Sequence, residues 1–98
     1  MRKANFDEFY SHLSAVYNLE EGIISDVLRE KIVEFAQKLD KSDNLYLLAD
    51  QLSVFVNAEV TALTWRAPKE LVELARYIQE LQVTYRRYVL GIDDLEEK

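Results

Sequence analysis

The apolar residues between positions 25 and 81 recur every three or four residues, in three runs separated by two breaks. The breaks are the polar stretch 40–43 and the proline-containing stretch 65–68. This spacing places apolar side chains on one side of each of three helices. A helix with such a face is stable in water only when other helices cover it. The pattern therefore predicts an all-α protein built from packed helices.

A further amphipathic helix is predicted in front of these three. It begins at Asn5, a favourable N-cap residue, and ends between Asn18 and Gly22, with Gly22 as its terminator. Its apolar face is expected to consist of Phe6, Phe9, Leu13, Val16 and Tyr17. Four helices are then expected in all.

The next two helices have clear boundary signals. The second is expected to be capped by Ser25 and closed by the polar stretch 40–43. The third is expected to follow Asp43 or Asn44 as its cap and to end near Leu63. Their buried stripes are predicted to be Leu28, Ile32, Phe35, Ala36 and Leu39, and Leu45, Leu48, Ala49, Leu52, Phe55 and Val56.

The fourth helix is predicted to be the longest. It begins at Pro68, which suits a first helical position because the missing N–H costs nothing there, and it runs to a stop at Gly91. Its stripe is predicted to be Leu71, Leu74, Ala75, Ile78, Leu81 and Tyr85. The acidic tail 92–98 is expected to be frayed.

Short connections between four helices predict an antiparallel up-down-up-down four-helix bundle with a long C-terminal helix. The sequence has two glycines and one proline, too few for the many tight turns of a β protein. Its 98 residues are expected to form a single domain.

Charge and composition limit the partners that the chain is expected to bind. The net charge of −6 argues against nucleic acid and against simple attraction to anionic lipid. There is no apolar run of about 18 residues, so we expect no direct membrane insertion. The absence of cysteine excludes a disulfide framework and fits a cytoplasmic location.

The residue types that carry catalysis are not arranged for it. His12 is the only histidine, and no Glu-x-x-His motif or glycine-rich loop occurs. The carboxylate pairs Glu30/Glu34 and Glu70/Glu73 fall on polar helix faces beside lysines, and we expect both pairs to be solvated rather than to form a buried acid–base site. We therefore expect no enzyme activity, no catalytic residue, no cofactor and no metal site.

Aromatic and arginine side chains gather toward the C-terminal part, and such residues dominate protein-binding hot spots. The candidate partner-binding residues are Trp65, Arg66, Arg76, Tyr77, Tyr85, Arg86, Arg87 and Tyr88. The alternative is that the tyrosines are half-buried in packing and the arginines form a basic helix C-terminus. Trp65 either covers the end of the core or stands exposed as an anchor.

Four segments of the chain carry a resemblance to a known family: residues 24–29, 35–45, 48–53 and 68–75. In order and spacing they resemble the enterocin A-type immunity proteins, which protect lactic acid bacteria and streptococci against pediocin-like (class IIa) bacteriocins. The resemblance covers about residues 6–81 and includes a Lys-Leu-x-Lys link, an Ala-x-x-Leu third helix and a proline opening the fourth.

The resemblance implies a cytoplasmic antiparallel four-helix bundle that protects a producing cell from its own peptide. It implies binding, at the inner face of the membrane, to the membrane component of the mannose phosphotransferase system that the peptide uses as receptor. It also implies that the C-terminal half, here Trp65 onward, decides which bacteriocin is countered. The family offers no catalytic residue to transfer to this chain.

A different class of function is also compatible with the sequence. A helical adaptor, or a toxin-neutralising protein, would bind a soluble partner or associate with itself as a weak homodimer. The aromatic content and the apolar breadth of the third predicted helix favour this alternative.

Overall fold

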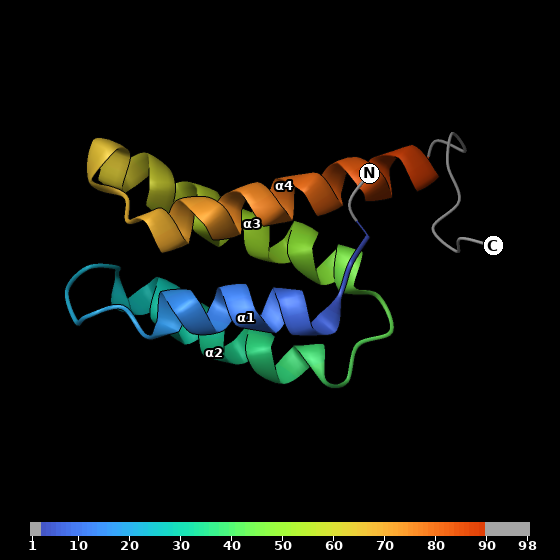
Figure 1. Ribbon diagram of the computed structural model, residues 1–98, viewed down its shortest axis with the longest axis horizontal. Helices are drawn as coiled ribbons and strands as arrows, with labels where there is room; N and C mark the ends of the chain where they lie inside the picture. The colour runs from blue at the N-terminus through green and yellow to red at the C-terminus, as the bar shows by residue number, and fades with distance from the viewer. Residues whose placement is uncertain (1–2, 90–98) are drawn as a thin grey trace.

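A computed structural model describes residues 3–89 of the chain (Figure 1). This part contains four α-helices and one short 3₁₀-helix: α1 Phe6–Tyr17, α2 Asp26–Leu39, α3 Leu45–Leu63, η1 Thr64–Arg66 and α4 Lys69–Val89. The all-α prediction is confirmed. The predicted stop at Gly91 and the predicted frayed tail 92–98 lie outside the described residues.

Successive helices run in opposite directions, as the chain colours in Figure 1 show. The first two helices lie side by side in one layer, and α3 with α4 forms the other layer. Across the layers α1 packs on α4 and α2 packs on α3, so each helix contacts two neighbours. This arrangement is the predicted up-down-up-down bundle, and α4, with 21 residues, is its longest helix.

Three of the helices begin at predicted cap residues, whose side chains accept a backbone N–H of the first turn. Asn5 Oδ1 accepts a hydrogen bond from the backbone N–H of Glu8 at 3.0 Å, and Ser25 Oγ accepts one from Leu28 N–H at 3.2 Å. Of the two candidates for α3, the cap is Asn44, whose Oδ1 accepts from Leu47 N–H at 3.1 Å. These bonds satisfy backbone donors that have no partner within the helix.

Two helix boundaries differ slightly from those expected. Helix α4 begins at Lys69, one residue after the predicted start, and the carbonyl of Pro68 accepts the N–H of Leu71 at 3.1 Å. Helix α1 ends at Tyr17, and Gly22 does not terminate it. Gly22 lies in the connection to α2 with φ 90°, a backbone conformation in which a Cβ would be strained.

The core lies between the two layers and is formed mainly by the predicted apolar stripes. Its buried side chains are Phe9, Leu13, Val16, Ile24, Leu28, Ile32, Phe35, Leu39, Leu48, Ala49, Leu52, Val56, Leu71, Leu74, Tyr77, Ile78 and Leu81. Phe6 and Tyr17 were expected on the buried face of the first helix but are exposed. They are its first and last residues, and Phe6 stacks on Tyr10 instead.

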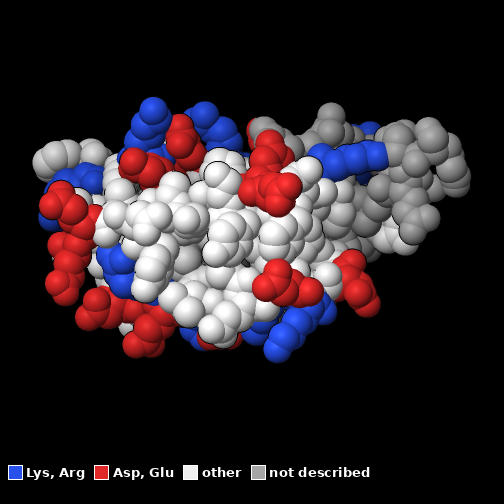
Figure 2. All heavy atoms as spheres, turned by 60° about the horizontal axis from the view of Figure 1, so that its bottom comes forward, with Lys and Arg blue, Asp and Glu red and all other residues white. Residues whose placement is uncertain are grey.

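The surface on the α1–α2 side carries a broad uncharged area across its middle, with acidic and basic side chains at its margins (Figure 2). Tyr10, Tyr17 and Val33 contribute exposed apolar surface on these two helices. Within residues 3–89, no helix combines the length and the apolar character needed to cross a membrane.

Candidate partner-binding surface

The candidate partner-binding residues lie on η1 and α4, spread along the length of α4 rather than gathered at one point. At 1.5 Å per residue, α4 is a rod of about 30 Å. Trp65 and Arg66 lie at one end of this rod, in η1, and the other candidates follow along α4. The set therefore extends along the whole length of α4.

Trp65 is the most exposed large apolar side chain of the described residues, with 89% of its surface open to solvent. Thr64 has a positive φ of 54°, which turns the chain out of α3 and carries Trp65 away from the core. Of the two interpretations of the sequence, the exposed position is therefore correct. Arg66 is exposed beside it.

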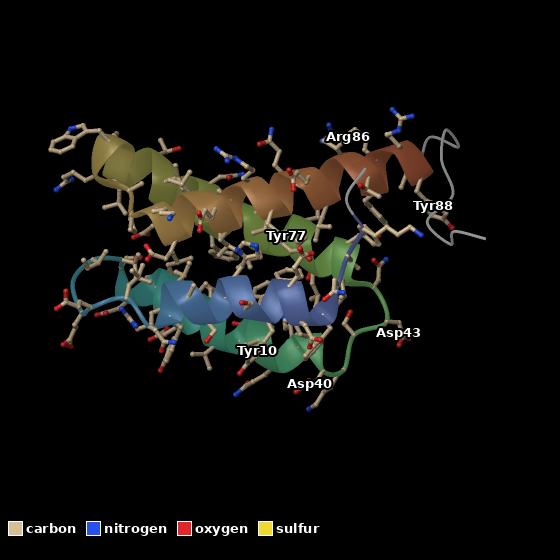
Figure 3. All side chains as sticks on the ribbon, viewed as in Figure 1. Tyr10, Asp40, Asp43, Tyr77, Arg86 and Tyr88 are labelled. Carbon is tan, nitrogen blue, oxygen red and sulfur yellow. The ribbon has the colours of Figure 1, made fainter. Side chains whose placement is uncertain are left out.

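Tyr77 is not a surface residue, and its assignment to the partner-binding set is wrong. Only 2% of its surface is exposed, and its ring packs edge-on against Phe9 at 5.5 Å between centroids. Figure 3 shows it between α4 and α1. Its hydroxyl bonds the backbone of Asn5, accepting from N–H and donating to the carbonyl, each at 3.3 Å. Tyr77 therefore holds the N-terminal segment on α4.

Tyr85 is half-buried, as the alternative interpretation expected for the tyrosines, and Arg87 is half-buried as well. The Tyr85 ring stacks on Tyr46 of α3, with 6.3 Å between centroids and 14° between planes. The Tyr46 hydroxyl in turn accepts the backbone N–H of Ala4 at 2.9 Å. Tyr85 thus belongs to the packing at this end of the bundle.

Arg86 and Tyr88 point to different sides of α4 (Figure 3). Arg86 points away from the α1–α2 layer, and Tyr88, 47% exposed, lies toward the opposite side of the helix. Residues that are two positions apart in an α-helix, such as Arg86 and Tyr88, differ by about 200° around its axis. Residues close in sequence therefore need not share a face of the helix. The predicted cluster of tyrosines and arginines is therefore divided between faces.

Arg76 and Arg86 lie together on a groove between α3 and α4, with a volume of about 480 Å³. We call it the α3–α4 groove. Its lining residues are Asn57, Val72, Ala75, Arg76, Gln79, Gln82, Val83 and Arg86. The valines and amides of this lining were not among the predicted site residues. The spacing of Val72, Gln79 and Val83 on α4 follows the helical period, and this signal was available in the sequence, whereas Asn57 comes from α3.

The wall of the groove is held by hydrogen bonds between the two helices. Gln82 Nε2 donates to Asp50 Oδ1 at 3.0 Å and to Ser53 Oγ at 3.1 Å. Ser53 Oγ donates to the backbone carbonyl of Asp50 at 2.6 Å. The carboxylate of Asp50 is thus hydrogen-bonded to Gln82. The two charged residues of the lining, Arg76 and Arg86, are both positive.

Within residues 3–89, the side chains of Arg76 and Arg86 make neither a salt bridge nor a hydrogen bond. The polar face of α2 is different. There Lys38 and Lys31 lie 3.0 Å and 3.2 Å from the carboxylate oxygens of Glu34. Hydrogen bonds from Lys38, the larger cause, and from Lys31 lower the pKa of Glu34. The charges on α2 compensate one another, whereas the two groove arginines have positive charge to offer a partner.

A second groove, of about 380 Å³, lies between α1 and α2. Its lining residues are Tyr10, Leu13, Ser14, Tyr17, Ile32, Val33, Ala36, Gln37 and Asp40. We call it the α1–α2 groove. It was not predicted, because Tyr10 falls outside the apolar stripe that the sequence pattern selects.

His12 packs against the core boundary. It is half-buried, and its ring stacks on Tyr77 with 4.8 Å between centroids. Among residues 3–89 there is no group of three or more histidine, cysteine, aspartate or glutamate side chains arranged to hold a metal ion. The features of the described surface that could bind a partner include the two grooves and the exposed Trp65.

Comparison of the chain with protein-family models, with curated proteins and with solved structures gave no match.

Proposed function

We propose that this chain is a bacteriocin immunity protein. It protects the producing cell from a pediocin-like peptide by binding, from the cytoplasmic side, the complex of that peptide with the membrane component of the mannose phosphotransferase system. The observation that carries the proposal is the agreement between the resemblance and the fold. The resemblance implies an antiparallel four-helix bundle, and the chain folds as one.

The helix boundaries support the same proposal. The resembling segments 24–29, 35–45 and 68–75 contain the start of α2, the α2–α3 connection and the start of α4, respectively. Ser25 and Asn44 serve as caps at the first two points, and Pro68 precedes the third. The resembling residues thus include those that set the lengths of the helices.

The surface supports binding to a protein. Trp65 stands almost fully exposed, and aromatic residues and arginine are enriched in protein interfaces. With a net charge of −6, attraction to the anionic inner leaflet is unfavourable. Docking at the membrane then depends on contacts with the receptor protein.

The test is expression of the chain in a bacteriocin-sensitive strain that is challenged with a panel of pediocin-like peptides. We expect growth to continue at peptide concentrations that stop the vector control, for at least one member of the panel. Trp65→Ala, expressed at the same level, should weaken the protection. Growth inhibition equal to that of the vector control, for every peptide, would contradict the proposal.

A helical adaptor or toxin-neutralising protein is the second candidate function, and the α1–α2 groove favours it. Tyr10 and Tyr17 line that groove with 48% and 44% of their surfaces exposed, outside the region that the resemblance assigns to specificity. Light scattering would detect a dimer, and a pull-down from cytosol would detect a soluble partner. A monomer that is retained only with membrane transport proteins would exclude this function.

A further inference from the structure

We propose that the α3–α4 groove binds an acidic, amphipathic α-helix of the partner protein. The inference deepens the proposed function and rests on it for the place of that helix, which is a segment of the receptor complex. The binding mode itself depends on three properties of the groove: its apolar surface, its two arginines, which have no partner among residues 3–89, and the distance between those arginines.

The apolar surface comes from Val72, Ala75 and Val83 of α4. Val72 and Val83 are 37% and 45% exposed, so part of each side chain remains available for burial by a partner. An amphipathic helix binds such a groove through apolar side chains spaced three and four residues apart. Covering this area with apolar side chains of a partner removes it from water, which favours the complex.

Charge determines which kind of helix fits. Arg76 and Arg86 are the charged lining residues, and neither has an electrostatic partner among residues 3–89. Arginine presents a planar fork of donors that matches the two oxygens of a carboxylate. The chain as a whole is acidic, so a basic helix would gain long-range attraction from the rest of the molecule but would be repelled here. The groove therefore selects glutamate or aspartate.

The distance between the two arginines sets the spacing of the acidic residues. They are ten positions apart on α4, or about 15 Å along its axis. On a partner helix lying along the groove, carboxylates eleven positions apart fall on one face, about 16 Å apart. Apolar residues between them would contact Val72 and Val83. Two arginines are too few for nucleic acid, whose binding is driven by many phosphate contacts.

Gln79 and Asn57 add polar contacts without adding charge. Both are exposed in the groove, and their amides can donate to or accept from the polar side of a bound helix. Gln82 is already engaged with Asp50 and Ser53, so it fixes the wall. The groove therefore keeps its shape when the partner is absent, which lowers the cost of binding.

The experiment uses the full chain and a synthetic helical peptide with two glutamates eleven positions apart and leucines between them on the same face. Binding is measured by fluorescence anisotropy of the labelled peptide and mapped by NMR amide shifts. We expect saturable binding, with the largest shifts around Val72, Gln79 and Val83, and weaker binding at higher salt. A version with lysine in place of both glutamates should not bind.

Charge reversal of both arginines, Arg76→Glu with Arg86→Glu, should weaken binding of the acidic peptide by about tenfold or more. It should also allow the lysine version to bind. The matched control is Lys41→Glu with Lys69→Glu, which makes the same change in net charge at exposed positions outside the groove lining and outside the candidate partner-binding set. Arg76→Gln with Arg86→Gln is the second variant, used if the charge reversal changes the circular dichroism spectrum.

The inference is overturned if the wild-type chain does not bind the acidic peptide, or if the groove variants and the control lose affinity equally. It is also overturned if phosphatidylglycerol vesicles bind to the arginines in place of the peptide. The proposed function fails separately. If the chain binds the peptide through the groove but protects no cell, the binding mode of the groove stands and the immunity function is contradicted. If the chain protects cells but has no affinity for the peptide, the immunity function stands and the binding mode is contradicted.

Discussion

Glu59 of α3 binds the first turn of α2 through Ser25. One carboxylate oxygen accepts the backbone N–H of Ser25 at 2.7 Å, and the other accepts its hydroxyl proton at 2.7 Å. The same hydroxyl oxygen accepts the N–H of Leu28 as the helix cap. A carboxylate at a helix N-terminus also interacts favourably with the helix dipole. This contact joins the two layers of the bundle at one end.

Glu59→Gln should lower the free energy of unfolding by about 1 kcal/mol, because a neutral amide replaces an acceptor of two charge-assisted hydrogen bonds. Urea denaturation measures the change. Glu30→Gln, at an exposed position on α2, removes the same charge and should have a much smaller effect. Equal losses in the two variants would show that net charge, and not the contact with Ser25, is responsible.

Phe35→Ala should destabilise the bundle by about 3–5 kcal/mol, since truncation of a buried aromatic leaves a cavity in the core. Phe35 is 3% exposed on α2. The control is Val27→Ala on the same helix, where 63% of the side chain is exposed, and its expected effect is within about 0.5 kcal/mol. An unchanged melting temperature for Phe35→Ala would contradict the packing of α2.

Tyr77→Phe should cost about 1 kcal/mol, because it removes the hydroxyl that bonds both backbone groups of Asn5 while leaving the ring in place. Hydrogen exchange should become faster at the start of α1. Tyr10→Phe is the control, since Tyr10 is 48% exposed. If both variants have wild-type stability and exchange, Tyr77 does not hold the N-terminal segment.

The fluorescence of Trp65, the single tryptophan, should show emission at the wavelength of an indole in water and ready quenching by iodide. Trp65→Ala should leave the unfolding free energy within about 0.5 kcal/mol of wild type, because the side chain makes little contact with the core. A blue-shifted emission in the free protein would mean that the side chain is buried. A blue shift that appears only with a partner would place Trp65 in the interface.

The ion pairs of Glu34 should make a small, pH-dependent contribution to stability. Its pKa is lowered from 4.5 by Lys38 and then Lys31, so the contribution is present above pH 4.5 and is lost as the pH falls through the lowered value. The stability difference between wild type and Glu34→Gln should therefore shrink on acidification. Urea denaturation at neutral pH and well below pH 4.5 measures it, and a difference that grows in acid would contradict the assignment.

The four helices were predictable because each start carries a local signal. Asn5, Ser25 and Asn44 can each accept a hydrogen bond from the backbone two or three residues ahead, and this requires no tertiary contact. The bundle followed from the short connections. The position of Trp65 could not be decided from sequence, because it depends on the positive φ at Thr64.

The surface was less predictable, because neighbours in sequence were grouped as neighbours in space. Tyr77 is three positions after Leu74 and four before Leu81, both on the buried stripe, so helical spacing does place it in the core. The α3–α4 groove depends on which sides of two helices meet, and Asn57 lies on a different helix from Arg76. The spacing of residues within one helix does not indicate which side of another helix packs against it.

The most direct measurement of the central claim is capture of the receptor by the protein. A tagged chain is expressed in a sensitive strain, the cells are treated with a pediocin-like peptide that they survive, and the detergent-solubilised membranes are passed over the tag resin. We predict that the membrane component of the mannose phosphotransferase system is retained with the tagged chain, and that the groove charge reversal at Arg76 and Arg86 releases it. Recovery of that component entirely in the unbound fraction, with and without the peptide, would contradict the account.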